Sequence, residues 1–235
     1  MAVTLAGGSA MAQPPEDPDE GPWSGSAEVS LVATSGNSDT RTVGLGGEIS
    51  YDPGTWKWLG RVAYVESEAD DELRARSQSA LVEVARPFSE RLGLYGRGGY
   101  LRDRFAGIER RLTTEGGLAY EVIATEPQSL QLRAGVGFTH EQRAVGDDLS
   151  LGTANVAGRY EWALSETSAL TEEAAFAADL NGGDDWRFTN EVAATAALST
   201  RLSLKVSHKL SYLAKPVPGF RKTDTIVSAA LVASF

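Results

Sequence analysis

Hydrophobic and polar residues alternate along almost the whole chain from Trp23 onward, in segments of about ten to fourteen residues that end at turn residues. A period of two residues is that of a β-strand, because successive side chains of a strand point to opposite faces of the sheet. The run LSLKVSHKLSY at 202–212 is among the clearest examples. About twelve such segments predict an all-β protein, a transmembrane antiparallel up-and-down β-barrel of about twelve strands.

The turn residues form two kinds of connection that alternate along the chain. Short breaks recur at intervals of roughly 34 to 40 residues, which is the length of one hairpin. The expected short turns are 52–54, 89–91, 126–128, 165–167 and 199–201. Longer connections are expected between them, at 36–39, 67–73, 105–109, 145–148, 181–185 and 215–222. An even strand number, with short turns at one end and longer loops at the other, is typical of a bacterial outer-membrane barrel.

The polar face of these segments carries charges of both signs, which decides the face that we expect inside. A soluble barrel turns its apolar face inward, whereas a membrane barrel turns that face to lipid and its polar face to a hydrated lumen. One Lys or Arg at the bilayer midplane costs about 2–4 kcal/mol, so these charges are expected in the lumen. The candidate lumen-lining residues are Glu28, Glu48, Arg61, Glu83, Arg97, Glu115, Glu121, Arg133, Arg159, Glu161, Arg187, Glu191, Lys205 and Lys209, and Lys57, Glu141, Glu173 and Asp224 share their face.

Two further features favour a membrane barrel over a secreted soluble one. Aromatic residues gather toward the segment ends, such as Trp58 and Trp162 near short turns and Trp186 and Tyr212 near long loops. Such belts are typical of membrane interfaces. The last alternating segment ends in Phe235 and resembles the carboxy-terminal signal of outer-membrane barrels. It implies the barrel assembly machinery as a partner.

Three polar residues interrupt the apolar face. Glu172, Asn190 and His208 fall at positions where the alternation places hydrophobic side chains. A β-bulge, a subunit contact or a shifted register would each account for them. The oligomeric state is therefore left open.

The first residues differ in composition from the rest. Residues 1–12 are small and apolar and end in Ala10-Met11-Ala12, which resembles the cleavage site of a secretory signal, although no positively charged stretch precedes them. Residues 13–22 are rich in Pro, Asp and Glu and too polar to pack. We therefore expect a signal-peptide remnant at 1–12, a flexible lead-in at 13–22 and an outer-membrane barrel at 23–235.

Composition and charge exclude several other classes of protein. The 235 residues include Lys+Arg 22 against Asp+Glu 32, a formal net charge of −10, which disfavours nucleic acid as a partner. The chain has no cysteine, so disulfide scaffolds and thiolate zinc sites are excluded. No run of about 18 consecutive apolar residues exists, which excludes a helical membrane span.

Two segments of the first half resemble a known family. They are the run ATSGNSDTRT at 33–42 and the segment 88–107, which begins FSERL and ends YLRDRFAG. With the alternation over most of 24–235, they resemble the YdiY-like family of salt-induced outer-membrane proteins, which carry a domain of unknown function. The resemblance implies a Gram-negative outer-membrane barrel with a link to the salt response. It supplies no catalytic residues.

These patterns favour a structural or envelope-stress role for a barrel with a charged, largely plugged lumen, because opposite charges can cross-link inside a narrow barrel. The alternative is a narrow passive channel for ions or small solutes. A second alternative is an enzyme acting on lipid or peptide, for which the two histidines are the candidate sites. His140 lies beside Glu141 near a strand end, whereas Ser207 points to the face opposite His208. We expect no catalytic residue and no cofactor.

Charged residues in the expected loops are weaker candidates for ligand sites. The doublets Asp70-Asp71, Asp147-Asp148 and Asp184-Asp185 can bind divalent cations through hard oxygen ligands, but solvated loop acids are the favoured explanation. Basic side chains at loop edges can meet lipopolysaccharide phosphates, which any barrel in that leaflet faces. They are Arg74, Arg76, Arg102, Arg104, Arg110, Arg111, Arg221 and Lys222. Lipid and lipopolysaccharide are therefore expected partners.

Overall fold

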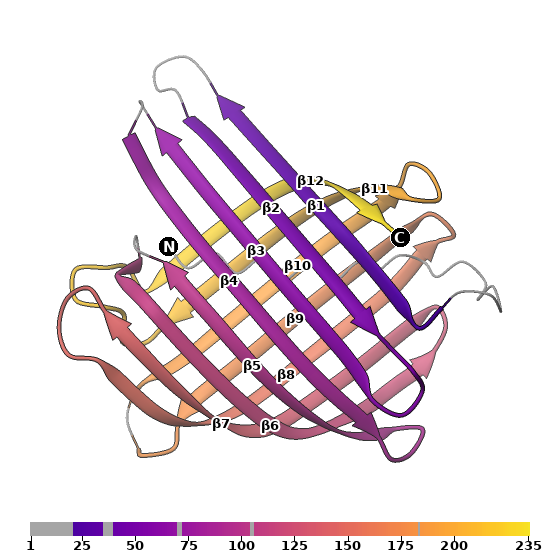
Figure 1. The fold of residues 1–235 in the computed structure, drawn as a ribbon, viewed down its shortest axis with the longest axis horizontal. Helices are drawn as coiled ribbons and strands as arrows, with labels where there is room; N and C mark the ends of the chain where they lie inside the picture. Colours follow the sequence, from indigo (N-terminus) through magenta and orange to yellow (C-terminus); the bar gives the residue numbers. More distant parts are fainter. Residues whose placement is uncertain (1–20, 35–39, 70–71, 104–105, 183) are drawn as a thin grey trace.

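The fold was analysed in a computed structural model, which describes residues 21–34, 40–69, 72–103, 106–182 and 184–235. The described residues form twelve β-strands in one closed antiparallel barrel (Figure 1). Each strand pairs with its neighbours in the chain, and β1 pairs with β12. The predicted all-β up-and-down barrel is confirmed. The expected signal remnant at 1–12 lies outside the described residues.

The strands are long enough to cross a bilayer. They are β1 (Trp23–Thr34), β2 (Thr40–Tyr51), β3 (Lys57–Ala69), β4 (Glu72–Pro87), β5 (Leu92–Asp103), β6 (Ile108–Thr125), β7 (Gln128–Arg143), β8 (Leu149–Ser165), β9 (Ser168–Asp179), β10 (Trp186–Ala197), β11 (Leu202–Leu213) and β12 (Thr223–Ser234). The shortest has 12 residues, whereas a tilted transmembrane strand needs about 9–11. Within the described ranges, no helix is long and apolar enough to span a membrane.

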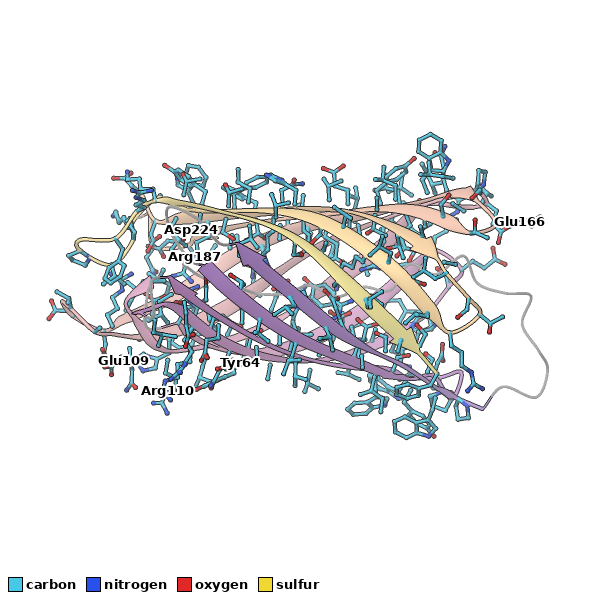
Figure 2. The ribbon with its side chains drawn as sticks, turned by 90° about the horizontal axis from the view of Figure 1, so that it is seen from above. Tyr64, Glu109, Arg110, Glu166, Arg187 and Asp224 are labelled. Carbon is cyan, nitrogen blue, oxygen red and sulfur yellow. The ribbon has the colours of Figure 1, made fainter. Side chains whose placement is uncertain are left out.

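The connections define two ends of the barrel. The turn end holds the connections β2–β3, β4–β5, β6–β7, β8–β9 and β10–β11, and the loop end holds the others. Figure 2 shows Glu166 at the turn end and Glu109 and Arg110 at the loop end. One expected loop is shorter than predicted, because strand pairing continues through most of 67–73. A register shift between Ser67 and Glu68 lets β3 continue to Ala69, and β4 begins at Glu72.

The apolar face of the sheet is outside and the charged face inside. On the outward face, Val29 is 55% exposed and Val136 is 62% exposed. On the inward face, Glu28 is 7% exposed and Lys205 is 4% exposed. This orientation is the one that the charge pattern predicts. It is the reverse of a soluble barrel and is typical of a barrel surrounded by lipid.

Aromatic rings form clusters on the outward face at both ends. At the turn end, the ring centroids of Trp23 and Tyr51 lie 4.4 Å apart. At the loop end, Trp186 lies 5.7 Å from Phe176 and 4.6 Å from Tyr212. Rings at two levels with aliphatic residues between them are the pattern of two interfacial girdles.

The barrel closes where β1 meets β12, and Phe235 completes this seam. The described pairing runs from Ser26 opposite Ser234 to Ser30 opposite Ala230. Beyond it, Gly25 and Phe235 exchange two backbone hydrogen bonds of 2.9 and 3.0 Å. The Phe235 ring covers Gly25, where a Cβ atom would lie only 2.6 Å from the ring. The seam therefore requires a residue without a side chain at position 25.

We expect Gly25→Val to weaken closure of the seam. The new side chain must displace the Phe235 ring, and overpacking of this kind costs about 1–3 kcal/mol. The fraction of protein that migrates as folded in an unboiled gel should fall relative to the unchanged chain. Gly98→Val is the matched control, because a Cβ atom at Gly98 meets nothing within 4 Å. Equal folded fractions for the two variants would contradict the role given to Gly25.

Candidate functional site in the barrel lumen

Inward-facing charges on neighbouring strands meet because the register places them opposite each other. Glu48 is opposite Arg61, and their side chains form a 2.5 Å ion pair. Arg159 is opposite Glu173, bonds to it, and also bonds to Glu161 at 2.5 Å. Opposite charges directly across a strand pair stabilise the sheet. These pairs follow from the alternation and the register alone.

At the turn end, a further ion pair is largely exposed. Lys57 Nζ lies 2.8 Å from Asp52 Oδ2. The hydrogen bond from Lys57 lowers the pKa of the Asp52 carboxyl. Because both side chains are well exposed, this pair belongs to the rim and not to the narrow part of the lumen.

A row of charges crosses the middle of the lumen wall. Glu83, Arg97 and Glu115 are opposite one another on β4, β5 and β6. Arg133 of β7 reaches across the lumen to Glu83 at 2.7 Å, and Tyr95 donates a hydrogen bond to Glu115. The Arg133 guanidinium also lies over the Tyr95 ring, 5.7 Å from its centroid. The two contacts of Arg133 join strands that are not adjacent in the barrel.

Arg97 is the most weakly held cation of this row. Its guanidinium lies 3.6 Å from Glu83 and 3.9 Å from Glu115, distances that exceed a hydrogen bond. Its buried Nε atom has no hydrogen-bond partner among the described residues. The two carboxylates are already engaged by Arg133 and Tyr95. Arg97 therefore keeps its Nε–H donor unused inside the lumen.

Three arginines surround one carboxylate near the loop end. Glu141 is 1% exposed, and its oxygens lie 2.5 Å from Arg111, 2.7 Å from Arg143 and 3.6 Å from Arg187. Arg187 is on β10, three strands away from Glu141 on β7. Arg111, which we expected at a loop edge facing lipopolysaccharide, instead points into the lumen. The strand begins earlier than predicted, so the two-residue period carries Arg111 to the inward face.

A lysine cluster lies beside the seam. Lys205 Nζ is 3.2 Å from Glu28 and 3.8 Å from Glu191, and Lys209 Nζ is 3.9 Å from Glu191. The remaining lumen candidate, Glu121, accepts a hydrogen bond from a Gln131 amide at 2.5 Å. All fourteen lumen-lining candidates are thus buried or half-buried, and each contacts another polar side chain.

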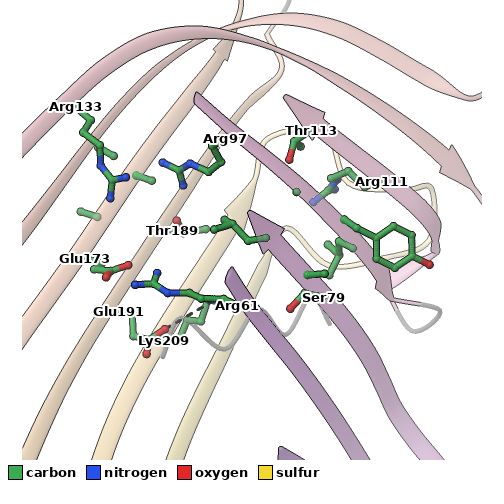
Figure 3. Close-up of a pocket in the computed structure, with 18 of the residues that line it drawn as sticks. Arg61, Ser79, Arg97, Arg111, Thr113, Arg133, Glu173, Thr189, Glu191 and Lys209 are labelled. Atoms are coloured by element: carbon green, nitrogen blue, oxygen red, sulfur yellow. Dashed lines mark ion pairs between the residues drawn. The ribbon is translucent and has the colours of Figure 1, made fainter. Parts of the chain in front are cut away.

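These charges enclose a cavity of about 280 Å³ in the lumen (Figure 3). Cations outnumber carboxylates among its lining residues. The cations are Arg61, Arg97, Arg111, Arg133 and Lys209, and the carboxylates are Glu173 and Glu191. Ser79, Thr113 and Thr189 add hydroxyl groups. The charge pattern does not reveal these hydroxyl residues, although their inward positions in the alternation do.

The β11–β12 loop at 214–222 covers part of the loop end. Its Val217 is 2% exposed and packs with Leu101 and Ile108 of the opposite wall. Figure 1 shows this yellow loop beside the β5–β6 connection. Gly107 makes the contact possible, because its φ is +73° and a Cβ atom there would lie 2.6 Å from Phe220. We call residues 214–222 the lid loop.

The start of β6 differs from the sequence-based prediction. Ile108 was expected within a loop, yet it begins β6 and is fully buried. Its side chain is the centre of the apolar cluster that holds the lid loop. The run Glu109-Arg110-Arg111 beside it interrupts the alternation, so the pattern alone could not show the start of this strand.

The histidines lie on the outward face. His140 Nδ1 is 2.9 Å from Ser150 Oγ in an exposed pair near the loop end. Ser207 is buried in the lumen, where its hydroxyl bonds to Ser228 at 2.8 Å, whereas His208 is exposed outside. The structure thus brings His140 and Ser150 together, a pair that the sequence analysis did not consider.

The acidic doublets do not converge within the described residues. No group of three His, Asp or Glu side chains there could hold a metal ion. Asp147, Asp148 and Asp184 are exposed, while Asp185 is buried at the loop end. Asp70-Asp71 lies outside the described residues.

Solved structures with this architecture are outer-membrane β-barrels. The translocator domain of the autotransporter NalP from Neisseria meningitidis aligns at 14% identity with a TM-score of 0.53, covering 93% of this chain and 90% of that one. The NanC porin aligns at 10% identity with a TM-score of 0.53, covering 89% and 98%. The KdgM porin in complex with disordered oligogalacturonate aligns at 10% identity with a TM-score of 0.52, covering 90% and 99%. At these identities the likeness establishes the fold alone.

Comparison of sequences identifies a family without an assigned activity. The profile of a family described as "Protein of unknown function, DUF481" matches residues 27–235. No curated protein matches the sequence. The match covers every strand except the first few residues of β1.

Proposed function

The chain belongs to the DUF481 family, and we propose that it is a bacterial outer-membrane barrel whose lumen is a narrow channel for small anions. The membrane location is supported by the apolar outward face, the aromatic clusters at both ends and the likeness to outer-membrane barrels. In this placement the loop end faces the outside of the cell and the turn end faces the periplasm.

The observation that carries the anion preference is Arg97. Its guanidinium borders the cavity, its buried Nε atom has no hydrogen-bond partner among the described residues, and two carboxylates lie only at longer range. A guanidinium has five N–H donors and binds carboxylate or phosphate oxygens in a fork geometry. The other cations that line the cavity add positive potential along the path. A small anion would therefore find an unused donor at the middle of the lumen.

A second candidate function is a structural barrel with a plugged lumen. It is favoured by the ion pairs that join distant strands, such as Arg133 with Glu83 and Arg187 with Glu141. The lid loop favours it as well, because it closes part of the loop end. The two candidates differ in one measurable property, since a plugged barrel carries no current.

The resemblance to the YdiY-like family implies a role in the salt response. A channel could take part in such a response because dissolved salt screens the ion pairs of its lumen. The Debye length falls from about 10 Å at 0.1 M salt to about 3 Å at 1 M, which weakens hydrated ion pairs. We propose that the ion pairs of the lumen loosen as salt rises. Conductance should then increase more steeply with KCl concentration than the conductivity of the solution does.

We expect Arg97→Gln to reduce anion preference in planar bilayers. The unchanged protein should give small conductance steps whose reversal potential under a KCl gradient shows preference for chloride. The variant should shift that potential clearly toward zero, because the unused cation is gone. Arg159→Gln is the control, since Arg159 donates hydrogen bonds to both Glu161 and Glu173 and its loss should change the potential less.

Three results would decide between the candidates. Conductance steps that prefer chloride, and that lose this preference in Arg97→Gln, support the anion channel. Absence of steps from protein shown to be folded supports the plugged barrel and overturns the channel. Conductance steps that prefer cations, or equal shifts of the reversal potential in Arg97→Gln and Arg159→Gln, overturn the role of Arg97.

Other features of the barrel support separate proposals about its partners and about catalysis. We propose that Phe235, which seals the seam over Gly25, is read by the barrel assembly machinery, and that outward basic residues of the loop end, such as Arg110, meet lipopolysaccharide. We assign no reaction to the barrel. The enzyme alternative now rests on His140 with Ser150, and it requires a lipid- or peptide-cleaving activity that His140→Ala abolishes.

A further inference from the structure

Three polar side chains form a cluster on the outward face of β9, β10 and β11. Glu172 of β9 and His208 of β11 are both opposite Val192 of β10. Asn190 donates a hydrogen bond from Nδ2 to Glu172 Oε1 at 2.9 Å. The β9–β10 and β10–β11 pairings run without a register shift. A bulge or a shifted register is therefore excluded as the explanation for these residues.

The cluster has unused hydrogen-bonding capacity. Glu172 is exposed, and its Oε2 atom accepts no hydrogen bond among the described residues. His208 is exposed as well, and Val192 of β10 separates it from Glu172. In a bilayer, ionisable side chains on the lipid face are costly and normally pair with one another. An acceptor and a donor thus lie a short way apart, on either side of Val192.

Small residues lie beside the cluster. Ala174 is opposite Asn190, and Ala194 follows Val192 on the outward face of β10. Small residues let two transmembrane walls approach closely, and polar side chains then bond across the contact. Larger aliphatic side chains border the cluster as well, since Leu170 and Val206 are opposite Ala194 and Leu210 is opposite Asn190.

We propose that this face binds a second copy of the same chain in the membrane. A two-fold axis along the membrane normal near Val192 would place β9 of each copy beside β11 of the other. Glu172 of each copy would then approach His208 of the other, which gives two equivalent contacts. Such a symmetric interface is isologous and is the commonest kind among homodimers. The cluster supplies both the acceptor and the donor, and two copies in one bilayer present their strands at the same depth. This inference is independent of conduction through each lumen.

Cross-linking of single cysteines tests the interface, because the natural chain has none. Val192→Cys lies at the proposed axis, and Val136→Cys is the matched control on the outward face of β7. Both full-length variants would be reconstituted in lipid vesicles and exposed to mild oxidation. We expect the Val192→Cys protein to form disulfide-linked dimers in severalfold higher yield than the control. In the Glu172→Leu/His208→Leu background that yield should fall to the control level.

Each other result would count against the proposal. Equal yields for Val192→Cys and Val136→Cys would overturn the interface. A high yield that persists in the Glu172→Leu/His208→Leu background would overturn the polar pairing as its basis. Unboiled gels would show that every variant is folded, and the two leucines suit a lipid-facing surface, so loss of folding is not the expected cause of a low yield.

Discussion

The Glu141→Gln variant is expected to lose about 3–5 kcal/mol of stability, the typical cost of removing one partner from a buried ion pair. Glu141 is 1% exposed and neutralises Arg111, Arg143 and Arg187 together. The glutamine keeps the size of the side chain but removes the carboxylate charge that all three guanidinium groups share. Like charges in a confined space then repel one another and destabilise the folded barrel.

Urea unfolding in detergent, followed by tryptophan fluorescence, measures this effect. The unfolding midpoint of Glu141→Gln should fall well below that of the unchanged chain. Glu121→Gln is the matched control, because Glu121 is half-buried and bonds to the neutral amide of Gln131. Its loss should be about 1 kcal/mol, as for one ordinary hydrogen bond. Equal midpoints for the two variants would contradict the special role of Glu141.

The Val217→Asp variant is expected to raise conductance severalfold. Val217 anchors the lid loop in the apolar cluster with Leu101 and Ile108. A carboxylate cannot enter that cluster without a large desolvation cost, so the lid loop should leave it. The strands themselves do not depend on this contact, and the barrel should stay folded.

Single-channel recording measures this effect, and Val145→Asp is the matched control. Val145→Asp introduces the same charge into the neighbouring β7–β8 connection, where Val145 is 53% exposed and free of the cluster. Its conductance should stay close to that of the unchanged protein. A Val217→Asp channel with unchanged conductance would show that the lid loop does not limit the path, even if the lumen conducts.

The strands and faces were predictable because they depend on local rules. Alternation along the chain indicates each strand, and the charges of one face indicate the lumen, as for Arg61 and Glu48. Pairs such as these are also predictable once neighbouring strands are in register. This is why the strand number and the up-and-down order agree with the structure.

The contacts across the lumen were not predictable in the same way. Arg133 reaches Glu83 because the closed barrel brings strands that are far apart in sequence within the length of two side chains. The lid loop depends on Val217 and Ile108, which are ordinary apolar residues at the edges of predicted loops. Nothing in a period of two residues indicates where a loop folds back. Curvature and closure decide these contacts, and neither is a local property of the sequence.

Labelling of single cysteines with a membrane-impermeant maleimide in proteoliposomes tests whether the outward face lies in lipid and the lumen holds water. We expect Thr113→Cys in the lumen cavity to be labelled, whereas Val136→Cys on the outward face should react only after unfolding. Ready labelling of Val136→Cys in the folded protein would place the apolar face in water and contradict the membrane barrel.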